Sequence, residues 1–369
     1  MPRRYLLPVL LLIVTPVAQA AAHDDIIEKI QMPEGFEIHL FGEVPNARSL
    51  TQAPDGTVFI GNRSGDKVWA LRDTDGDHVA DERWVIAEGL NSPNGVAWFE
   101  GDLYISEIGV ISKVADILDQ PRGEYELQVV YDDLPTDEHH GWRYIAFGPD
   151  GKLYVPIGVP CNVCNEEGYG IFIRMDPDGS NVEQYAKGIR NSVGFDFDPE
   201  TGDLWFTDNG RDWMGDNLPD CELNHAPREG MHFGFPYCHE GDVKDPEFGE
   251  GVDCSQYTPP VVELGPHVAP LGMRFYTGRQ FPEKYRGGIF IAEHGSWNRS
   301  EKIGYRVKFV DESGDTATQE VFARGWLQPG EKVLGRPVDV LVRPDGSLLV
   351  SDDAAGLVYR IHYTGAAAN

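Results

Sequence analysis

Four aspartates in a short acidic run have the spacing of oxygen ligands for a metal ion. Asp73, Asp75, Asp77 and Asp81 form the pattern D-x-D-G-D-x-x-x-D, and carboxylates at alternate loop positions converge on a hard cation such as Ca²⁺. The run departs from the EF-hand pattern, because Trp84 stands at the twelfth position, where that loop has a bidentate glutamate. We predict a structural Ca²⁺ site without a catalytic role; the alternative is an acidic surface turn between two strands.

Five cysteines are the other chemically reactive residues. Cys161 and Cys164 form a C-x-x-C pair, and covalent haem is excluded because no histidine follows it. A small loop disulfide is therefore favoured over a metal or redox site. Cys238 and Cys254 bracket a stretch rich in glycine, proline and acidic residues, and we expect them to form a second disulfide. Cys221 is left over, either as a free thiol or as an exchange partner for the others.

An internal repeat organises the elements that must position these residues. Each copy has a short alternating apolar strand, a tight turn carrying Asp-Gly or another glycine, and a second alternating strand. The copies span residues 49–63, 94–107, 144–158, 194–210, 272–293 and 338–353. Units of roughly 58 residues predict an all-β, six-bladed β-propeller with four-stranded antiparallel blades. Two stacked β-sandwiches are the alternative.

Two parts of the chain lie outside this repeat. The strand Phe36 to Phe41 is expected to pair with the last strands and close the ring, which removes exposed edges. The long interval 211–265 is predicted to be a loop insertion rather than another blade.

The N-terminus has the features of a secretory signal. A positively charged start precedes a short apolar run, Leu6 to Val17, and Ala18-Gln19-Ala20 forms a small-x-small cleavage site. The run is shorter than the ~20 residues needed to span a bilayer, which disfavours the alternative of a membrane anchor. We therefore predict a signal peptide over residues 1–20, a single propeller domain over 21–369, and a periplasmic or secreted protein without a membrane span.

The charge balance limits the partners of this domain. There are 31 lysines and arginines against 60 acidic residues, a net charge of −29. Such acidity argues against binding to nucleic acid or anionic membranes, which both require a positive surface. It is compatible with divalent cations, neutral substrates and basic protein partners.

Several blocks in the loops between the repeats form a specific combination. They lie at 137–155, 161–164, 188–194, 198–212, 269–279, 293–300 and 335–361. Together they resemble the soluble pyrroloquinoline-quinone (PQQ) dependent sugar dehydrogenases, and in particular the sorbosone-dehydrogenase branch. The resemblance covers most of the chain after the first strand. It implies an exported quinoprotein that oxidises an aldose or a related sugar aldehyde by hydride transfer from C1 to PQQ. A histidine would act as general base, and Ca²⁺ would polarise the quinone.

The resemblance also implies which residues form the catalytic centre. His139 would be the base, in the motif H-x-x-x-R that Arg143 closes, and His140 is the rival base or a substrate contact. Arg190 and Asn191 match the pair that contacts cofactor and substrate, and Arg190 would also assist catalysis.

Further positions follow from the same family pattern. Arg336 and His294 would join Arg143, Arg190 and Asn191 in binding PQQ, and His267 would face the substrate. The catalytic Ca²⁺ would be bound by the main-chain carbonyls of Gly210 and Arg211.

The chain departs from the family pattern at four places. Val338 replaces a second arginine, and the family's glutamine is absent near Asn94. The family's lysine falls within residues 294–296, where no lysine is present and His294 and Arg299 are the available substitutes. Cys221 takes a position that is usually acidic. These departures remove polar groups from a site that would bind PQQ, which bears three carboxylates.

Three functions are consistent with these features. The first is the sugar-oxidising quinoprotein, which would pass electrons to a separate acceptor such as a basic cytochrome. The second is a Ca²⁺-dependent sugar lactonase, which would need acidic and asparagine ligands on the ring axis. The third is a non-enzymatic binding propeller, because one fold hosts many functions.

Overall fold

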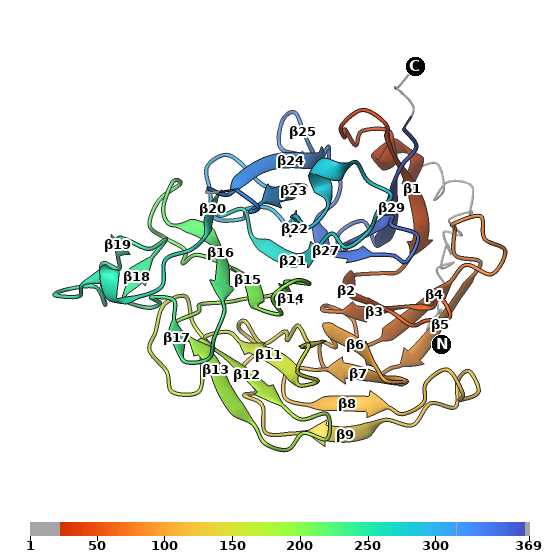
Figure 1. Cartoon of the computed structure of the whole chain (residues 1–369), viewed down its shortest axis with the longest axis horizontal. Coiled ribbons are helices and arrows are strands. Elements are labelled where there is room, and N and C mark those ends of the chain that lie inside the picture. Colours follow the sequence, from red (N-terminus) through yellow and green to blue (C-terminus); the bar gives the residue numbers. More distant parts are fainter. Residues whose placement is uncertain (1–22, 315, 366–369) are drawn as a thin grey trace, which may run out of the picture.

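The computed structural model describes residues 23–314 and 316–365, which form a ring of six β-sheets (Figure 1). The predicted six-bladed propeller is therefore confirmed, and the two-sandwich alternative is wrong. The predicted signal peptide lies outside the described residues. Among the described residues, no helix combines the length and the apolar character that a membrane crossing requires.

Each blade begins with the strand nearest the ring axis. Blade 1 contains β2 (Ala47–Gln52), β3 (Val58–Asn62), β4 (Val68–Arg72) and β5 (Glu82–Ala87). Blade 2 contains β6 (Gly95–Phe99), β7 (Asp102–Ser106), β8 (Ile111–Val114) and β9 (Gln128–Tyr131). Blade 3 contains β10 (Ala146–Phe147), β11 (Leu153–Ile157), β12 (Ile171–Met175), β13 (Glu183–Lys187) and β17 (Met231–His232).

The other three blades continue the same order. Blade 4 contains β14 (Phe195–Phe197), β15 (Leu204–Asp208), β16 (Asp220–Ala226) and β20 (Val262–Pro266). Blade 5 contains β21 (Pro270–Phe275), β22 (Ile289–Glu293), β23 (Arg306–Asp311) and β24 (Thr318–Arg324). Blade 6 contains β27 (Pro337–Val342), β28 (Leu348–Asp352), β29 (Leu357–Tyr363) and β1 (Phe36–Glu43).

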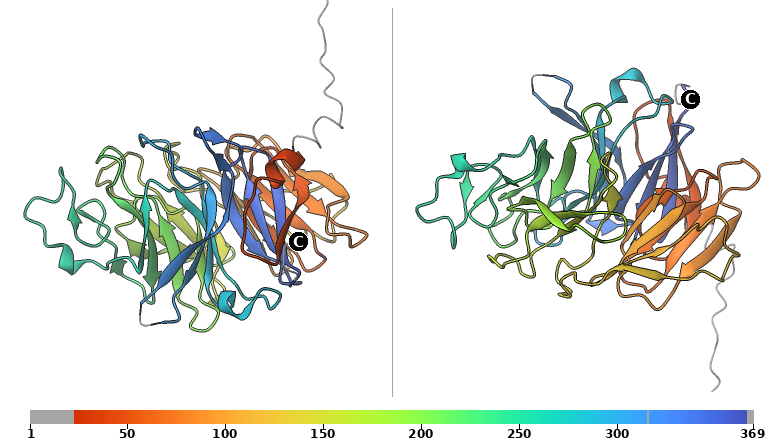
Figure 2. Two further views of the ribbon diagram at one scale, coloured as in Figure 1. Left: turned by 90° about the horizontal axis from the view of Figure 1, so that it is seen from above. Right: turned by 60° about the horizontal axis from the view of Figure 1, so that its bottom comes forward.

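Short elements lie in the connections between these strands. Between β16 and β20 of blade 4 lie β18 (Cys238–His239), β19 (Val243–Lys244) and the 3₁₀ helix η1 (Cys254–Gln256). The 3₁₀ helix η2 (Glu283–Tyr285) lies between β21 and β22 of blade 5, and β25 (Leu327–Gln328) and β26 (Lys332–Val333) link blades 5 and 6. The segment with β18 and β19 projects from the ring, as both views of Figure 2 show.

The predicted hairpins form because glycines fit the tight turns and because apolar residues fit the buried strands on either side. Gly56 and Gly151, in the Asp-Gly turns, have φ of 90° and 75°, a region that glycine enters without a steric penalty. The second strands β3, β11, β15, β22 and β28 are buried along their whole length. Neighbouring blades cover both of their faces, so these strands form a rigid scaffold around the ring axis.

The ring closes through the first and last strands of the chain. β1 pairs antiparallel with β29, with Phe36 opposite Tyr363, which confirms the predicted closure. The ring of Phe36 also contacts Phe281 and Phe322 edge to face, at centroid distances of 4.8 and 4.9 Å. Strands from the two ends of the chain thereby complete one blade, in which β1 is the outermost strand.

Two details of the predicted architecture need correction. Blade 3 has a fifth strand, because β17 pairs in parallel with β13. The interval 211–265 is not only a loop, since it contains β16 and the start of β20, which complete blade 4. The apolar alternation of these strands is weak, so the repeat pattern does not identify them.

The cysteine predictions are confirmed. Cys161 bonds to Cys164, and Cys238 bonds to Cys254 across the projecting segment. Cys221 is a buried free thiol on β16. Burial raises the pKa of this thiol to about 12, so it is protonated at neutral pH.

Candidate functional site

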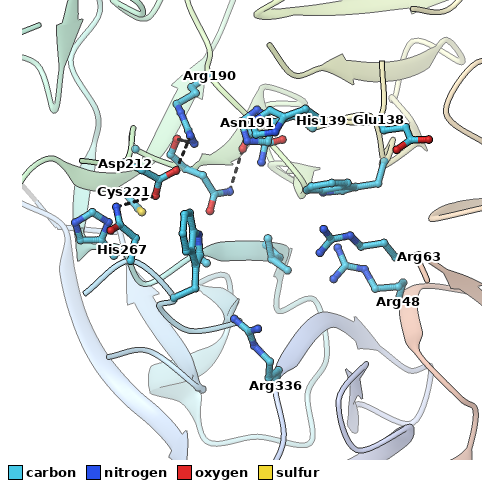
Figure 3. Close-up of a pocket in the computed structure, with 18 residues that line it drawn as sticks. Arg48, Arg63, Glu138, His139, Arg190, Asn191, Asp212, Cys221, His267 and Arg336 are labelled. Carbon is cyan, nitrogen blue, oxygen red and sulfur yellow. Dashed lines mark hydrogen bonds and ion pairs between the residues drawn. The ribbon is translucent and has the colours of Figure 1, made fainter. Parts of the chain in front are cut away.

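A cavity of about 770 Å³ opens at the end of the ring where the first strands begin (Figure 3). Its lining comes from segments that precede the innermost strands and from segments that follow the second strands of the blades. The predicted site residues that line it are His139, His140, Arg190, Asn191, Gly210, His267 and Arg336. The ring therefore brings together loops from blades that are distant in sequence.

Three residues predicted for the catalytic centre lie outside the lining. Arg143 is buried and donates hydrogen bonds to the carbonyls of His140 and Pro135, at 3.0 and 2.9 Å. It thus fixes the loop that carries the two histidines. The guanidinium of Arg211 points to Asp245, at 2.6 Å, so only its main chain remains as a metal ligand.

His294, the third of these residues, lies behind the cavity wall. Its Nε2 is 2.8 Å from a carboxylate oxygen of Asp353, and its carbonyl accepts a hydrogen bond from Arg336 Nε at 3.0 Å. Burial lowers the pKa of His294 to about 4. His294 therefore positions Arg336 and does not itself face the cavity.

Three arginines form one side of the cavity, which we call the arginine wall: Arg48, Arg63 and Arg336 (Figure 3). Arg48 donates to Asn94 at 2.9 Å and pairs with Asp353 at 3.0 Å. Arg63 stacks over Trp142, with its guanidinium carbon 3.7 Å from a ring centroid.

Two cations of the arginine wall are not neutralised. Among the described residues, the guanidinium of Arg336 donates only to the main-chain carbonyls of His294 and Gly295, and the guanidinium of Arg63 contacts the face of an indole. Neither guanidinium pairs with a carboxylate in the described part of the chain. Burial, with Arg48 nearby, lowers the pKa of Arg63 to about 10, so it remains charged at neutral pH. The wall therefore presents positive charge to the cavity.

Sequence reasoning missed Arg48, Arg63 and Trp142. The signal for Arg48 was present, because it directly precedes the first repeat as Arg143 precedes the third. Two of the positions that depart from the expected family pattern make contacts beside the cavity. Asn94, near the absent glutamine, binds Arg48, and Val338 packs in an apolar cluster beside Trp142.

Arg190 lies on the other side of the cavity. Unlike Arg63 and Arg336, its guanidinium pairs with a carboxylate of the protein. It donates to the carbonyl and the side chain of Asn162 at 2.8 and 3.0 Å, to the Asn209 carbonyl at 3.2 Å, and to Asp212 at 3.1 Å. The buried carboxylate of Asp208 accepts the main-chain N–H groups of Arg190 and Asn191, at 2.8 and 2.7 Å. Arg190 thus positions the loop of Asn162 and Asp212.

The two adjacent histidines are both biased toward the neutral form. Nδ1 of His140 is 2.8 Å from the Val159 carbonyl, which can only accept a hydrogen bond, so Nδ1 carries the proton. Burial and the charge of Arg190 lower the pKa of His140 well below its ordinary value. The same two causes lower the pKa of His139, whose side chain is more exposed. Exposed and unprotonated, His139 is able to accept a proton from a ligand in the cavity.

Two tryptophans form an exposed pair at the mouth of the cavity. Trp297 lines the cavity and is 66% exposed, and Trp213 is 68% exposed. Their rings meet edge to face at 5.6 Å. His267 lies nearby on the lining and bonds through Nε2 to the Gly215 carbonyl at 2.8 Å. The mouth therefore combines apolar ring faces with polar groups.

The predicted metal ligands fall in two places. Gly210 lines the cavity, where no three acidic, histidine or cysteine side chains of the described residues converge. In the peripheral acidic run, oxygens of Asp73, Asp75 and Asp77 lie within 4.8 Å of one another. Asp81 lies outside this group and accepts the amide and the hydroxyl of Thr74, at 2.7 and 2.8 Å.

Comparisons with known proteins agree with this architecture. The profile of a family described as a domain of unknown function (DUF7133) matches residues 24–359. An uncharacterized protein of Borreliella burgdorferi is 33% identical over 359 residues, with 93% of each chain covered. The aldose sugar dehydrogenase YliI of Escherichia coli is 25% identical over 331 residues, covering 75% of this chain and 83% of that protein.

Solved structures show the same fold. The PQQ domain of pyranose dehydrogenase from Coprinopsis cinerea superposes with a TM-score of 0.74 at 17% identity, over 90% of this chain and 97% of that one. The PQQ-bound aldose sugar dehydrogenase of Streptomyces coelicolor gives 0.63 at 18% identity, over 90% and 99%. The chain therefore belongs to the DUF7133 family, and its propeller is the fold of the PQQ-dependent sugar dehydrogenases that its motifs resemble.

Proposed function

We propose that this protein oxidises a sugar with PQQ bound in the cavity. The observation that carries the proposal is the arginine wall: Arg63 and Arg336 face the cavity without a carboxylate partner, in a chain of net charge −29. Local positive charge in so acidic a protein favours the binding of an anionic ligand. PQQ bears three carboxylates, and guanidinium groups bind carboxylates through paired hydrogen bonds.

The residues present fit this cofactor. Arg63 and Arg336 would bind its carboxylates, Arg48, paired with Asp353, completes the wall beside them, and Trp142 offers an aromatic face beside Arg63. Ca²⁺ would be held in part by the main-chain carbonyls of Gly210, which lines the cavity, and of Arg211, whose side chain is directed to Asp245. When bound, PQQ supplies the oxidant, because it accepts hydride from the sugar carbon.

His139 is the general base of this proposal. Its lowered pKa keeps the imidazole neutral at the pH at which a sugar hydroxyl must lose its proton. His140 is less accessible, and its Nδ1 proton is bound to the Val159 carbonyl. Asp212 lies near enough to favour the imidazolium of His139 electrostatically, and the exposure of His139 lets it return the proton to water.

The sugar would enter over the tryptophan pair. The C–H face of a pyranose is apolar and its hydroxyls are polar, which matches the exposed rings of Trp213 and Trp297 beside the imidazole of His267. Asn191 is held by Asp208 through its main chain, so its side chain is positioned for a hydroxyl group. These contacts support an aldose or a related sugar aldehyde as substrate.

The setting of the reaction is part of the same proposal. Residues 1–20 would export the protein to the periplasm or the medium. A separate acceptor would take the electrons, and the net charge of −29 favours a basic one, such as a cytochrome. No observation favours the lactonase or the purely binding propeller.

Reconstitution tests the proposal. The purified chain is stripped of metal, loaded with PQQ and CaCl₂, and assayed for dye reduction by several aldoses. We expect turnover that needs both additions, and its loss in His139→Ala with PQQ binding retained. His225→Ala is the matched control, because His225 pairs with Asp203 away from the cavity. Folded protein that binds no PQQ and oxidises no aldose would refute the proposal, and lactone hydrolysis with Ca²⁺ alone would establish the hydrolase instead.

A further inference from the structure

Two histidines and a glutamate converge on the strand pair that closes the ring, away from the cavity. Glu37 and His39 lie on β1, and His362 lies on β29 (Figure 1 labels both strands). One ligand atom from each lies within 4.8 Å of the others. None of these residues belongs to the proposed catalytic site.

Strand geometry places the three side chains on one face. Residues two apart on a strand point to the same side, so Glu37 and His39 are neighbours on that face. His362 is directly opposite Glu37 in the antiparallel register. A directly opposed residue and its diagonal neighbour lie within side-chain reach. The arrangement therefore follows from the register of ring closure.

The distances between the ligand atoms suit a small cation. His39 Nε2 and His362 Nε2 lie 3.4 and 3.8 Å from the same oxygen of Glu37. Ligands at about 2.0–2.1 Å in a tetrahedron around Zn²⁺ are about 3.4 Å apart. The two imidazoles are stacked with their centroids 5.1 Å apart, so side-chain rotation would bring their nitrogens to the spacing of a bound ion.

The ligand types select the metal. Two imidazoles and one carboxylate suit Zn²⁺ and its transition-metal neighbours, whereas Ca²⁺ and Mg²⁺ prefer oxygen ligands. Glu37 and His39 are about half exposed, with side-chain values of 52% and 54%, so the ion could enter from solvent and keep a water ligand.

Arg360 is the nearest cationic side chain on this face. Burial, and then the charge of Arg360, lower the pKa of His362, but the Arg360 guanidinium is bound elsewhere. Arg360, opposite His39 in the register, donates instead to Ser347 and Asp345, at 3.1 and 2.8 Å. Its guanidinium is thus directed to a carboxylate of its own blade. Nδ1 of His362 has no hydrogen-bond partner among the described residues. No donor therefore forces Nδ1 to act as an acceptor. The ring can carry its proton on Nδ1 and leave Nε2 free to bind a metal ion.

We propose that Glu37, His39 and His362 bind Zn²⁺ or a similar transition-metal ion, which clips the first strand of the propeller to the last. The ion would join residues that are far apart in sequence at the seam of the ring. Because the three ligands come together only in the folded chain, binding stabilises the closed ring. The site is structural and independent of PQQ.

The test uses tag-free, full-length protein that has been stripped with EDTA and titrated with ZnCl₂ in a calorimeter. We expect one site in the wild-type chain and binding at least about tenfold weaker in His39→Gln and in His362→Gln. His78→Gln is the matched control: His78 is exposed and lies close enough to influence His362 electrostatically, but it is not one of the converging ligands.

Thermal unfolding gives a second measurement. Zn²⁺ should raise the Tm of the wild-type chain and of His78→Gln, and leave that of His39→Gln unchanged. His39 is exposed, so its replacement should not prevent folding. The proposal is wrong if the wild-type chain binds no Zn²⁺, or if the His39 and His362 variants bind it as tightly as the control. A Co²⁺ spectrum without tetrahedral bands would rule out the proposed geometry.

Discussion

Replacement of Asp352 by asparagine should make the protein more stable at neutral and alkaline pH. Asp352 ends β28 and is fully buried. One carboxylate oxygen accepts the main-chain N–H groups of Arg336, Ala354 and Ala355, at 2.8, 3.0 and 2.9 Å. The other accepts the hydroxyl of Tyr359 at 3.0 Å. In the asparagine variant, the amide oxygen can accept the same three main-chain N–H groups. The NH₂ group can donate to the Tyr359 oxygen once the tyrosine hydroxyl rotates away.

The size of the effect follows from the cost of burying the charge. Burial raises the pKa of Asp352 from 3.8 to about 6. At about 1.4 kcal/mol per pH unit, the ionised carboxylate disfavours the folded state by about 3 kcal/mol. The folded state binds the proton more tightly, so wild-type stability falls as pH rises from about 4 to 6. The neutral asparagine avoids this loss.

Urea unfolding at several pH values measures the difference. Asp352→Asn should exceed the wild-type chain by about 2–3 kcal/mol at pH 8, and the gain should vanish near pH 4. Asp345→Asn, in the same blade, is the control of opposite sign. Burial raises the pKa of Asp345, but hydrogen bonds from Ser347 and Arg360 outweigh it and leave the pKa at about 2. The ionised form of Asp345 therefore stabilises the fold above pH 4. Asp345→Asn should lower the free energy of unfolding in that pH range.

The reasoning fails if Asp352→Asn is destabilised at pH 8, or if its advantage does not change with pH. The same variant also informs the site. Asp352 holds the main chain of Arg336, so asparagine should preserve PQQ binding, and Asp352→Ala should weaken it.

Three further outcomes are expected. The acid limb of the pH–rate profile should lie below the ordinary histidine value of 6.5, because the pKa of His139 is lowered and the base must be unprotonated; a limb above 6.5 would contradict this. Phe36→Ala should cost about 3 kcal/mol in urea unfolding, because it removes the aromatic contacts to Phe281 and Phe322 at the ring seam; an unchanged midpoint would refute this. Cys254→Ser opens the disulfide that spans 16 residues and should cost about 3 kcal/mol, seen as a lower Tm; an equal Tm would show that the bond adds no stability.

The blades could be predicted from the sequence because their signals are local. Alternating apolar strands and Asp-Gly turns recur along the chain. The strand that begins at Phe36 stands before the first repeat, so it was available to pair with the strands of the last blade. The short strand β17 was missed because two residues carry no periodicity. Such pairings depend on where a loop returns in three dimensions.

The candidate site was predictable only in part. His139, Arg190 and Arg336 stand in recognisable motifs, and all three line the cavity. Arg63 has no such motif, because it reaches the cavity from the segment after β3. The sequence also could not show that Arg190 bonds to Asp212, since that contact joins two loops of the closed ring.

Equilibrium binding of PQQ to the purified chain tests the central claim most directly. Tryptophan fluorescence and PQQ absorbance both report it. Arg228→Ala, which removes an exposed arginine outside the cavity lining, is the control for charge. We predict saturable binding by the wild-type and control chains, and about 10- to 100-fold weaker binding in Arg63→Ala and in Arg336→Ala, because each loses charge-assisted hydrogen bonds. Equal PQQ affinity in all four chains, or no binding by the wild-type chain, would contradict a PQQ site at the arginine wall.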